Sequence, residues 1–182
     1  MSITVRRART SDVAVIRRLV DAYARDRILL DKPTVTLFED IQEFWMAEKN
    51  DGSGVAGSDG AASPAVIGCG ALHVLWEDLA EVRTLAVHPD YRGSGAGHLL
   101  LERLIQTARD LGVGRLFCLT FQVNFFKAHG FNEIDGSPVD PEVYGELLRS
   151  YDEGVAEFLG LERVKPNTLG NTRMLLDLGQ SI

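Results

Sequence analysis

The sequence predicts an α/β (α+β) protein with a mixed central sheet of about seven strands and helices on both faces. Apolar runs typical of buried strands, such as AVIGCGALHVLW at 65–76 and RLFCLT at 115–120, alternate with stretches of helical periodicity. Some of these strands follow one another directly and others are separated by a helix. That order produces a mixed sheet with helical crossovers.

The N-terminal part begins with a short strand at 3–5 and continues into a helix capped by Thr10-Ser11-Asp12. The apolar face of this helix consists of Val13, Ile16, Leu19, Val20 and Tyr23. A short second helix is expected over 34–40 and a strand over 43–48. Residues 49–65 are rich in Gly, Ser, Asp and Ala and lack hydrophobic periodicity, so we expect a flexible loop there, before the strand at 65–76.

The next strand contains Val82, Leu85, Ala86 and Val87 and stops at Pro89. A glycine loop follows, and then an amphipathic helix that Gly112 closes. The remaining expected elements are a strand at 115–120, a helix at 122–129, a strand starting at 131–134, helices within 141–149 and 151–161, and a last strand at 171–178.

Length and charge limit the classes of protein. At 182 residues the chain is most simply one domain spanning 1–182. A net charge of −7 argues against general nucleic-acid binding. Apolar runs stay well short of the ~20 residues of a membrane span, and MSITVRRART lacks the apolar core of a signal peptide. We therefore expect a cytoplasmic protein without membrane partners, and an exposed sheet edge makes a homodimer one option.

The two cysteines, Cys69 and Cys118, are widely spaced and lie in strand-like runs. They form neither a zinc motif nor a disulfide framework, and we expect two buried free thiols. His73 has no companion ligands at useful spacing. No metal is expected.

The loop Arg92-Gly93-Ser94-Gly95-Ala96-Gly97 follows a strand and opens a helix. Such a loop can present several backbone N–H groups to an anion at the positive end of a helix dipole. No Gly-Lys-Ser/Thr follows, so the loop is not a nucleotide-binding P-loop. The loop of a dinucleotide-binding Rossmann fold follows the first strand, whereas this one follows a later strand. The loop predicts a site for a phosphorylated cofactor.

The segment from Ala86 to Gly97 resembles the signature of the GNAT acyltransferases, with its (Q/R)-x-x-G-x-(G/A) element at Arg92–Gly97. Phe126-Lys127-Ala128-His129-Gly130-Phe131 resembles the Y-x-x-x-G-F of the same superfamily. The resemblance spans roughly residues 2–134 and implies a GNAT fold and acetyl-CoA as co-substrate.

Further segments resemble the acetyltransferase domain of the N-acetylglutamate synthase family. They are Gly68–Leu72, Ala80–Arg83, Leu116–Thr120 and the tail Val164–Arg173, which resembles short single-domain bacterial members. The longer synthases carry an amino-acid-kinase domain that binds arginine. This sequence has no room for one, so we expect none.

The resemblance implies a set of site residues. Glu81, six residues before Val87, stands where some GNAT enzymes carry a general base; the alternative is a solvated strand end. The implied contacts to the pantetheine arm of CoA are main-chain groups of Leu85, Ala86 and Val87. The implied contacts to its pyrophosphate are Arg92, Gly93, Ser94, Gly95, Ala96 and Gly97. Asn124, Phe126 and Lys127 are implied to lie near the pantetheine arm and the adenosine. Phe126 occupies the position of a usual Tyr and cannot donate a proton. A group near Thr120 or Gln122 is one replacement.

An acidic acceptor needs cationic or polar partners. The candidates are Lys32, Arg83, Thr120, Gln122, Thr172 and Arg173. Arg83 is unusual for a buried strand, so it either faces a polar site or pairs with an acid. Thr172 and Arg173 point to opposite faces of the last strand.

The implied reaction is acetyl transfer from acetyl-CoA to the α-amino group of L-glutamate, with L-glutamine left open as the acceptor, and it is the first step of arginine biosynthesis. One alternative is a GNAT enzyme for another amine, such as a protein N-terminus, a polyamine or an aminoglycoside. A further alternative is a non-catalytic acyl-CoA-binding regulatory module.

Overall fold

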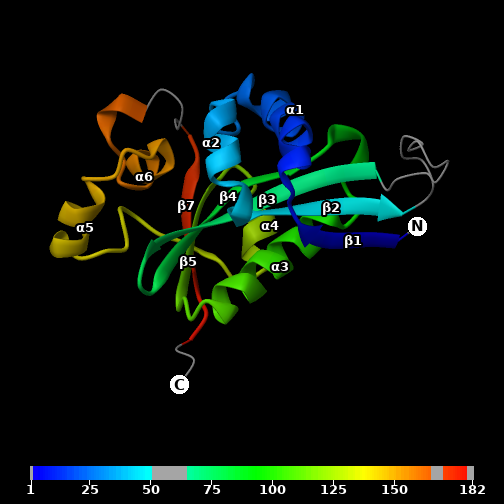
Figure 1. Ribbon diagram of the computed structural model, residues 1–182. Helices are drawn as coiled ribbons and strands as arrows, with labels where there is room; N and C mark the ends of the chain where they lie inside the picture. Colours follow the sequence, from blue (N-terminus) through cyan, green and yellow to red (C-terminus); the bar gives the residue numbers. More distant parts are fainter. Residues whose placement is uncertain (1, 51–64, 165–169, 180–182) are drawn as a thin grey trace. The chain divides into compact units, whose positions relative to one another are not determined.

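The computed structural model describes residues 2–50, 65–164 and 170–179. Seven strands form one sheet in the order β1-β2-β3-β4-β5-β7-β6. They are β1 (Ser2–Arg7), β2 (Phe44–Asn50), β3 (Ala65–Trp76), β4 (Leu79–Val87), β5 (Arg115–Thr120), β6 (Asn132–Glu133) and β7 (Thr172–Asp177). β4 and β5 run parallel, whereas β1–β2, β2–β3, β5–β7 and β6–β7 are antiparallel. The predicted mixed sheet is confirmed (Figure 1).

The helices are α1 (Val13–Ala24), α2 (Thr34–Glu39), α3 (Ala96–Asp110), α4 (Val123–Lys127), α5 (Pro141–Leu147) and α6 (Glu153–Phe158). Four 3₁₀ turns, Thr10–Asp12, Ile41–Glu43, Pro89–Tyr91 and Glu162–Val164, complete the described elements. α3 ends as its sequence predicts: Gly112 has φ 79°, and Val113 N donates to Ala108 O over 2.9 Å.

Several boundaries differ from the sequence predictions. β2 starts at Phe44 and β4 already at Leu79, while β6 spans two residues only. Most of the loop predicted for 49–65 lies outside the described residues. Its first two residues belong to β2, and Ala65 opens β3.

The described chain forms two compact units. The first contains the residues up to Leu72 together with Thr84–Thr107, and the second contains His73–Arg83 together with the residues from Ala108 on. The division crosses both β3 and β4. The single domain predicted for 1–182 stays a prediction.

Helices cover both faces of the strands in the first unit (Figure 1). On one face, α1 and α2 bury Ile16, Leu19 and Leu37 in a core with Phe44 and Met46 of β2. On the other face, α3 packs Ala96 and Leu100 against Ala47 and Ile67. Successive side chains of a strand point to opposite faces, so β2 supplies Met46 to one core and Ala47 to the other.

The close packing of α3 requires glycine on β3. A Cβ added at Gly68 would lie 2.9 Å from Ala86 O and 3.2 Å from Leu100 Cδ1, and one at Gly70 would lie 3.1 Å from Leu104 Cδ1. Side chains larger than hydrogen at these two positions would therefore push α3 and β4 away from β3.

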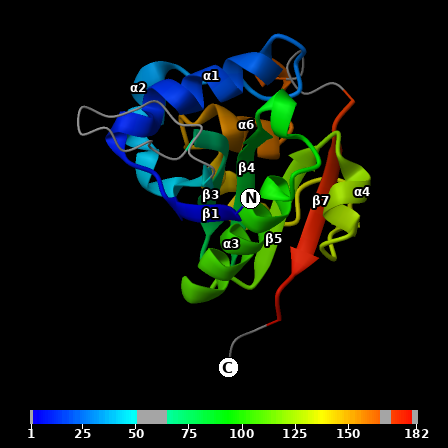
Figure 2. The same cartoon turned by 90° about the vertical axis from the view of Figure 1, so that its right-hand side faces the viewer.

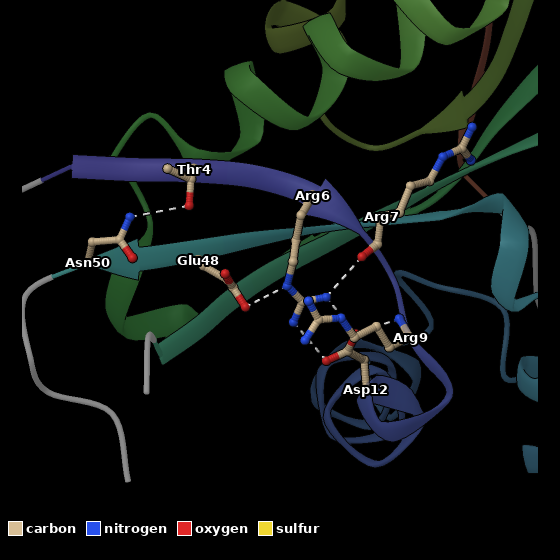
Figure 3. A network of polar contacts seen from close by, with 7 residues as sticks. All are labelled: Thr4, Arg6, Arg7, Arg9, Asp12, Glu48 and Asn50. Carbon is tan, nitrogen blue, oxygen red and sulfur yellow. Dashed lines mark hydrogen bonds and ion pairs between the residues drawn. The ribbon is translucent and has the colours of Figure 1, made fainter. Parts of the chain in front are cut away.

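Arg6 ties the sheet edge to the start of α1 (Figure 3). Its Nε donates to Glu48 Oε1 of β2 over 2.7 Å, and its Nη1 donates to Asp12 Oδ2 over 2.7 Å. Asp12 Oδ2 also accepts from Arg9 N over 2.7 Å. Burial opposes ionisation of Asp12, yet these hydrogen bonds outweigh it and lower the pKa of the carboxyl.

The second unit has its own core, in which α5 and α6 pack on the strands. Phe117 of β5 and Phe158 of α6 meet edge to face with centroids 4.9 Å apart, and Leu79, Leu147 and Val155 join them. β7 lies beside β5, as Figure 2 shows, with Phe117 opposite Leu175. This core determines which side chains of β4 and β7 face α6.

Candidate active site

The centre of the second unit is a buried ion pair on β4. Glu81 and Arg83 are only 3% and 7% exposed, and Arg83 Nε donates to Glu81 Oε2 over 2.7 Å. Because they are two residues apart on a strand, both point to the same face. Glu81 therefore does not lie at a solvated strand end, and Arg83 pairs with an acid.

The N-terminus of α6 meets the same guanidinium. Asp152 Oδ1 accepts from Val155 N over 2.7 Å as the N-cap, and it lies 2.8 Å from Arg83 Nη1. A Cβ added at Gly154 would lie 2.5 Å from Arg83 Cζ. Only a glycine lets α6 approach Arg83 so closely.

Glu157 lies three residues after Gly154, hence on the same side of α6. Burial and the negative charge of Glu81 raise the pKa of Glu157 to about 7, against the lowering effects of Arg83, Asn171 and Arg173. Asn171 Nδ2 donates to Glu157 Oε1 over 3.3 Å. Glu157 is not among the site residues predicted from the sequence, because locally it is one glutamate in a short amphipathic segment.

Arg173 of β7 holds the opposite end of α6. Its Nη2 donates to Phe158 O, its Nε donates to Gly136 O over 2.7 Å, and its guanidinium lies 4.9 Å above the Phe117 ring. Burial lowers the pKa of Arg173, whereas the charges of Glu81 and Glu157 raise it. Arg173 thus belongs to the same set of charges as Glu81 and Arg83.

Thr172 and Thr120 are paired in register on β7 and β5. Thr120 is buried, and its Oγ1 accepts from Gln122 N over 2.8 Å. The side chain of Gln122 is exposed just before α4. Strand alternation directs Thr172 away from the face that carries Arg173.

The residues predicted along the cofactor arm in this unit lie on α4. Phe126 is buried, with its ring centroid 5.1 Å from that of Phe131. Asn124 and Lys127 are exposed, and Lys127 Nζ lies 2.6 Å from Glu133 Oε1. The Phe126 side chain thus packs in the core and fixes the position of α4.

The glycine loop belongs to the first unit. Gly93 and Gly95 have φ of 78° and 89°, which glycine adopts without strain. An added Cβ at either would meet no heavy atom of the described residues within 4 Å. Ser94 Oγ accepts from Ala96 N over 3.4 Å, and Ala96 and Gly97 start α3. The loop is therefore open and leads into a helix N-terminus, where backbone N–H groups lack intrahelical partners.

Tyr23 of α1 connects β4 to this loop. Its hydroxyl donates to Val87 O and accepts from Arg92 Nε over 3.3 Å. The Arg92 guanidinium also lies 5.2 Å from the centroid of the Tyr23 ring. Neighbouring Leu85 and Ala86 pack in the cores on the two faces of this unit. Before them, Thr84 has φ 53°, an unusual conformation for a β-branched residue.

Lys32 is the one candidate acceptor residue in the first unit. It is 7% exposed, and its Nζ lies 3.3 Å from Asp40 Oδ2. Its ammonium is thus paired with a carboxylate of α2's C-terminal end.

The thiols of Cys69 and Cys118 are buried, as the sequence predicts. Burial raises the pKa of Cys69 to about 12 and that of Cys118 well above its ordinary value. Across the described residues, His, Cys, Asp and Glu form no group of three that could hold a metal ion. Within the same residues, no helix has the length and apolar character needed to span a membrane.

Several known proteins are similar to this chain in sequence and in structure. The acetyltransferase (GNAT) family model matches residues 16–131. The amino-acid acetyltransferase of Mycobacterium tuberculosis is 58% identical over 174 residues, covering 96% of this chain and 94% of that protein. The amino-acid acetyltransferase of Shewanella oneidensis is 37% identical over 138 residues, covering 74% of this chain and 28% of that protein.

Solved structures show the same fold. The crystal structure of Rv2747 from Mycobacterium tuberculosis in complex with CoA and NLQ has a TM-score of 0.88 at 57% identity, covering 97% of this chain and 99% of that one. N-acetylglutamate synthase from Neisseria gonorrhoeae, complexed with coenzyme A and N-acetyl-glutamate, has a TM-score of 0.71 at 22% identity, covering 99% of this chain and 36% of that one. The second likeness concerns the fold alone. The family model and the 58% identical relative together show that this chain belongs to the GNAT acetyltransferase family.

Proposed function

We propose that this protein transfers the acetyl group of acetyl-CoA to the α-amino group of L-glutamate or L-glutamine, as the first step of arginine biosynthesis. The observation that carries the proposal is the 58% identity, over almost the whole length of both chains, to a protein named amino-acid acetyltransferase. The crystal structure of Rv2747 with CoA, at 57% identity, supports the choice of co-substrate.

The first unit supplies the proposed CoA site. The open loop Arg92–Gly97 suits a pyrophosphate, since Gly93 and Gly95 leave the backbone accessible. Main-chain groups of Leu85, Ala86 and Val87 would pair with the pantetheine arm in the manner of an added strand. The Tyr23 hydroxyl holds Val87 O and Arg92 together at this point. The other proposed cofactor contacts, Asn124, Phe126 and Lys127, belong to the second unit.

The second unit supplies the proposed acceptor chemistry. A protonated amine cannot attack a thioester, so a carboxylate must take its proton, and Glu81 is the carboxylate that the family resemblance proposes. Arg83 and Arg173 add positive charge toward an acidic acceptor, although Glu81, Asp152 and backbone carbonyls already occupy several of their donors. The further proposed acceptor contacts in this unit are Thr120, Gln122 and Thr172, and Lys32 is the proposed contact that belongs to the first unit.

The leaving thiolate is stable without full protonation, so its departure needs little general-acid catalysis. This is consistent with Phe126, whose side chain has no proton to donate. Most of the acceleration is then expected from holding amine and thioester together, with backbone N–H groups polarising the carbonyl.

The test is release of free CoA from acetyl-CoA with glutamate, glutamine, aspartate, spermidine and peptides as acceptors. Turnover with glutamate or glutamine and little with spermidine is the expected result. Turnover with spermidine but with no amino acid would contradict the proposed acceptor. An absence of turnover with every amine would contradict an enzymatic role.

A further inference from the structure

The second unit holds a carboxyl group whose surroundings differ from those of Glu81. Glu81 is almost fully buried and already neutralised by Arg83 Nε at 2.7 Å. Glu157 is only partly buried, and its Oε1 accepts from the neutral amide of Asn171 over 3.3 Å. A desolvated carboxylate whose direct partner is a neutral amide binds a proton more readily than one in water.

α6 brings Glu157 to the β4 ion pair. Gly154 lies directly on the Arg83 guanidinium, and Asp152 pairs with Arg83 Nη1 at 2.8 Å. One helical turn after Gly154, Glu157 projects from the same side of α6. From the other end, Arg173 binds Phe158 O and fixes the C-terminus of the helix.

The charges around Glu157 are balanced only when its carboxyl is protonated. Among the residues that the structure describes, the charged groups that act on it are Glu81 and Arg83 of β4 and Arg173 of β7, and Asp152 adds a negative charge through Arg83. Two carboxylates and two guanidiniums sum to zero, so ionised Glu157 leaves one negative charge. An arriving ammonium group compensates that charge, and transfer of its proton restores the balance.

We propose that Glu157 is a second carboxyl of the reaction centre, which takes the proton from the acceptor's ammonium group in place of Glu81, the base that the family resemblance implies, while Glu81 stays paired with Arg83. This inference rests on the proposed amino-acid acetylation. In the step, one N–H bond of the ammonium breaks and its electron pair stays on nitrogen, while the proton forms an O–H bond with Glu157 Oε2. The free amine then attacks the thioester carbonyl: an N–C bond forms, the C–S bond breaks with its electron pair on sulfur, and the second proton lost by nitrogen goes to the leaving thiolate, which gives free CoA. Burial and the charge of Glu81 raise the pKa of Glu157 to about 7, which suits a group that exchanges protons near neutral pH.

The experiment measures kcat/KM against pH for the wild type, Glu157→Gln, Glu81→Gln and Glu153→Gln. We expect the wild-type rate to rise through an inflection near pH 7, and Glu157→Gln to lose that inflection together with about 10²–10⁴-fold of the rate. Glu153 lies on the same helix, is exposed and pairs with Arg163 at 3.2 Å, so its variant is the matched control and should retain the wild-type profile.

The Glu81→Gln variant distinguishes the role of Glu81 from that of Glu157. It removes the partner of Arg83 and a negative charge near Glu157, so an inflection should persist but move to lower pH. An inflection that survives in Glu157→Gln with a rate within about twofold of the wild type would overturn the inference. Wild-type turnover of no amino acid would overturn the proposed function and the inference with it.

A second measurement covers the case in which Glu157→Gln does not fold. The wild-type protein is labelled with ¹³C at its glutamate carboxyl carbons, and the NMR resonances of these carbons are followed from pH 4 to pH 9. We expect one glutamate resonance to titrate near pH 7. If every glutamate titrates below about pH 5.5, in the ordinary range for this side chain, the inference is wrong.

Discussion

Arg83 Nε donates to Glu81 Oε2 over 2.7 Å, between two side chains that share one face of β4 and are both buried. The pair acts on α6 in two ways. Through Asp152, Arg83 reaches the N-cap of α6, and through its charge Glu81 acts on Glu157. A short strand segment therefore determines both the position of α6 and the ionisation of its carboxyl.

Arg83→Ala should lower the free energy of unfolding by about 3–5 kcal/mol, because it leaves Glu81 charged and buried without its partner. Denaturation by urea at pH 7 measures the change. Arg149→Ala removes an exposed pair with Glu146 at 3.4 Å and should cost less than about 1 kcal/mol. Equal losses for the two variants would show that the buried pair has no special role.

Gly154→Ala should destabilise the protein by about 1–3 kcal/mol, because the new methyl group overlaps the Arg83 guanidinium. The control is Gly145→Ala in α5, where a Cβ meets no atom of the described residues within 4 Å. Gly145→Ala should raise the stability by about 0.5–1 kcal/mol through helix propensity. Thermal unfolding compares them, and a gain for both variants would contradict the close packing of α6 on Arg83.

Tyr23→Phe should weaken CoA binding about threefold to tenfold, because the hydroxyl that holds Val87 O and Arg92 together is lost while the ring remains. Isothermal titration calorimetry with CoA measures the dissociation constant. Tyr151→Phe, at a position that is 98% exposed, should leave the constant unchanged. An unchanged constant for Tyr23→Phe as well would remove this network from the proposed CoA site.

Glu157 should make the folded protein less stable as the pH rises. The pKa of its carboxyl is raised by burial from an ordinary 4.5 to about 7, so between these values the folded state binds more protons than the unfolded state. Its contribution to stability is full below about pH 4.5 and is lost as the pH approaches 7.

Glu157→Gln removes this dependence and should gain on the order of 1–3 kcal/mol relative to the wild type between pH 4.5 and pH 8. Urea denaturation at the two pH values measures it. If Glu157→Gln is more stable than the wild type at pH 8 but less active, its loss of activity does not come from lost stability. That result would support a role of Glu157 in proton transfer. A constant difference between variant and wild type at both pH values would contradict the raised pKa.

The fold was largely predictable because its signals are local. Apolar periodicity predicts most of the strands and helices, and the strand–glycine loop–helix segment at 82–112 predicts an anion site from a single stretch of chain. Element boundaries were less accurate at β2 and β6, where short strands acquire their ends from partners far away in the sequence.

The sequence by itself determined the mixed-sheet fold class, the GNAT family and the glycine loop before a helix, because apolar periodicity, short motifs and turn residues are local features of the chain. Only the tertiary structure decided that Arg83 pairs with Glu81 and Asp152, and that burial and the charge of Glu81 raise the pKa of Glu157. Desolvation and charge pairing depend on which distant segments meet. No local pattern encodes the contact between Gly154 and Arg83 that brings this carboxyl to the sheet.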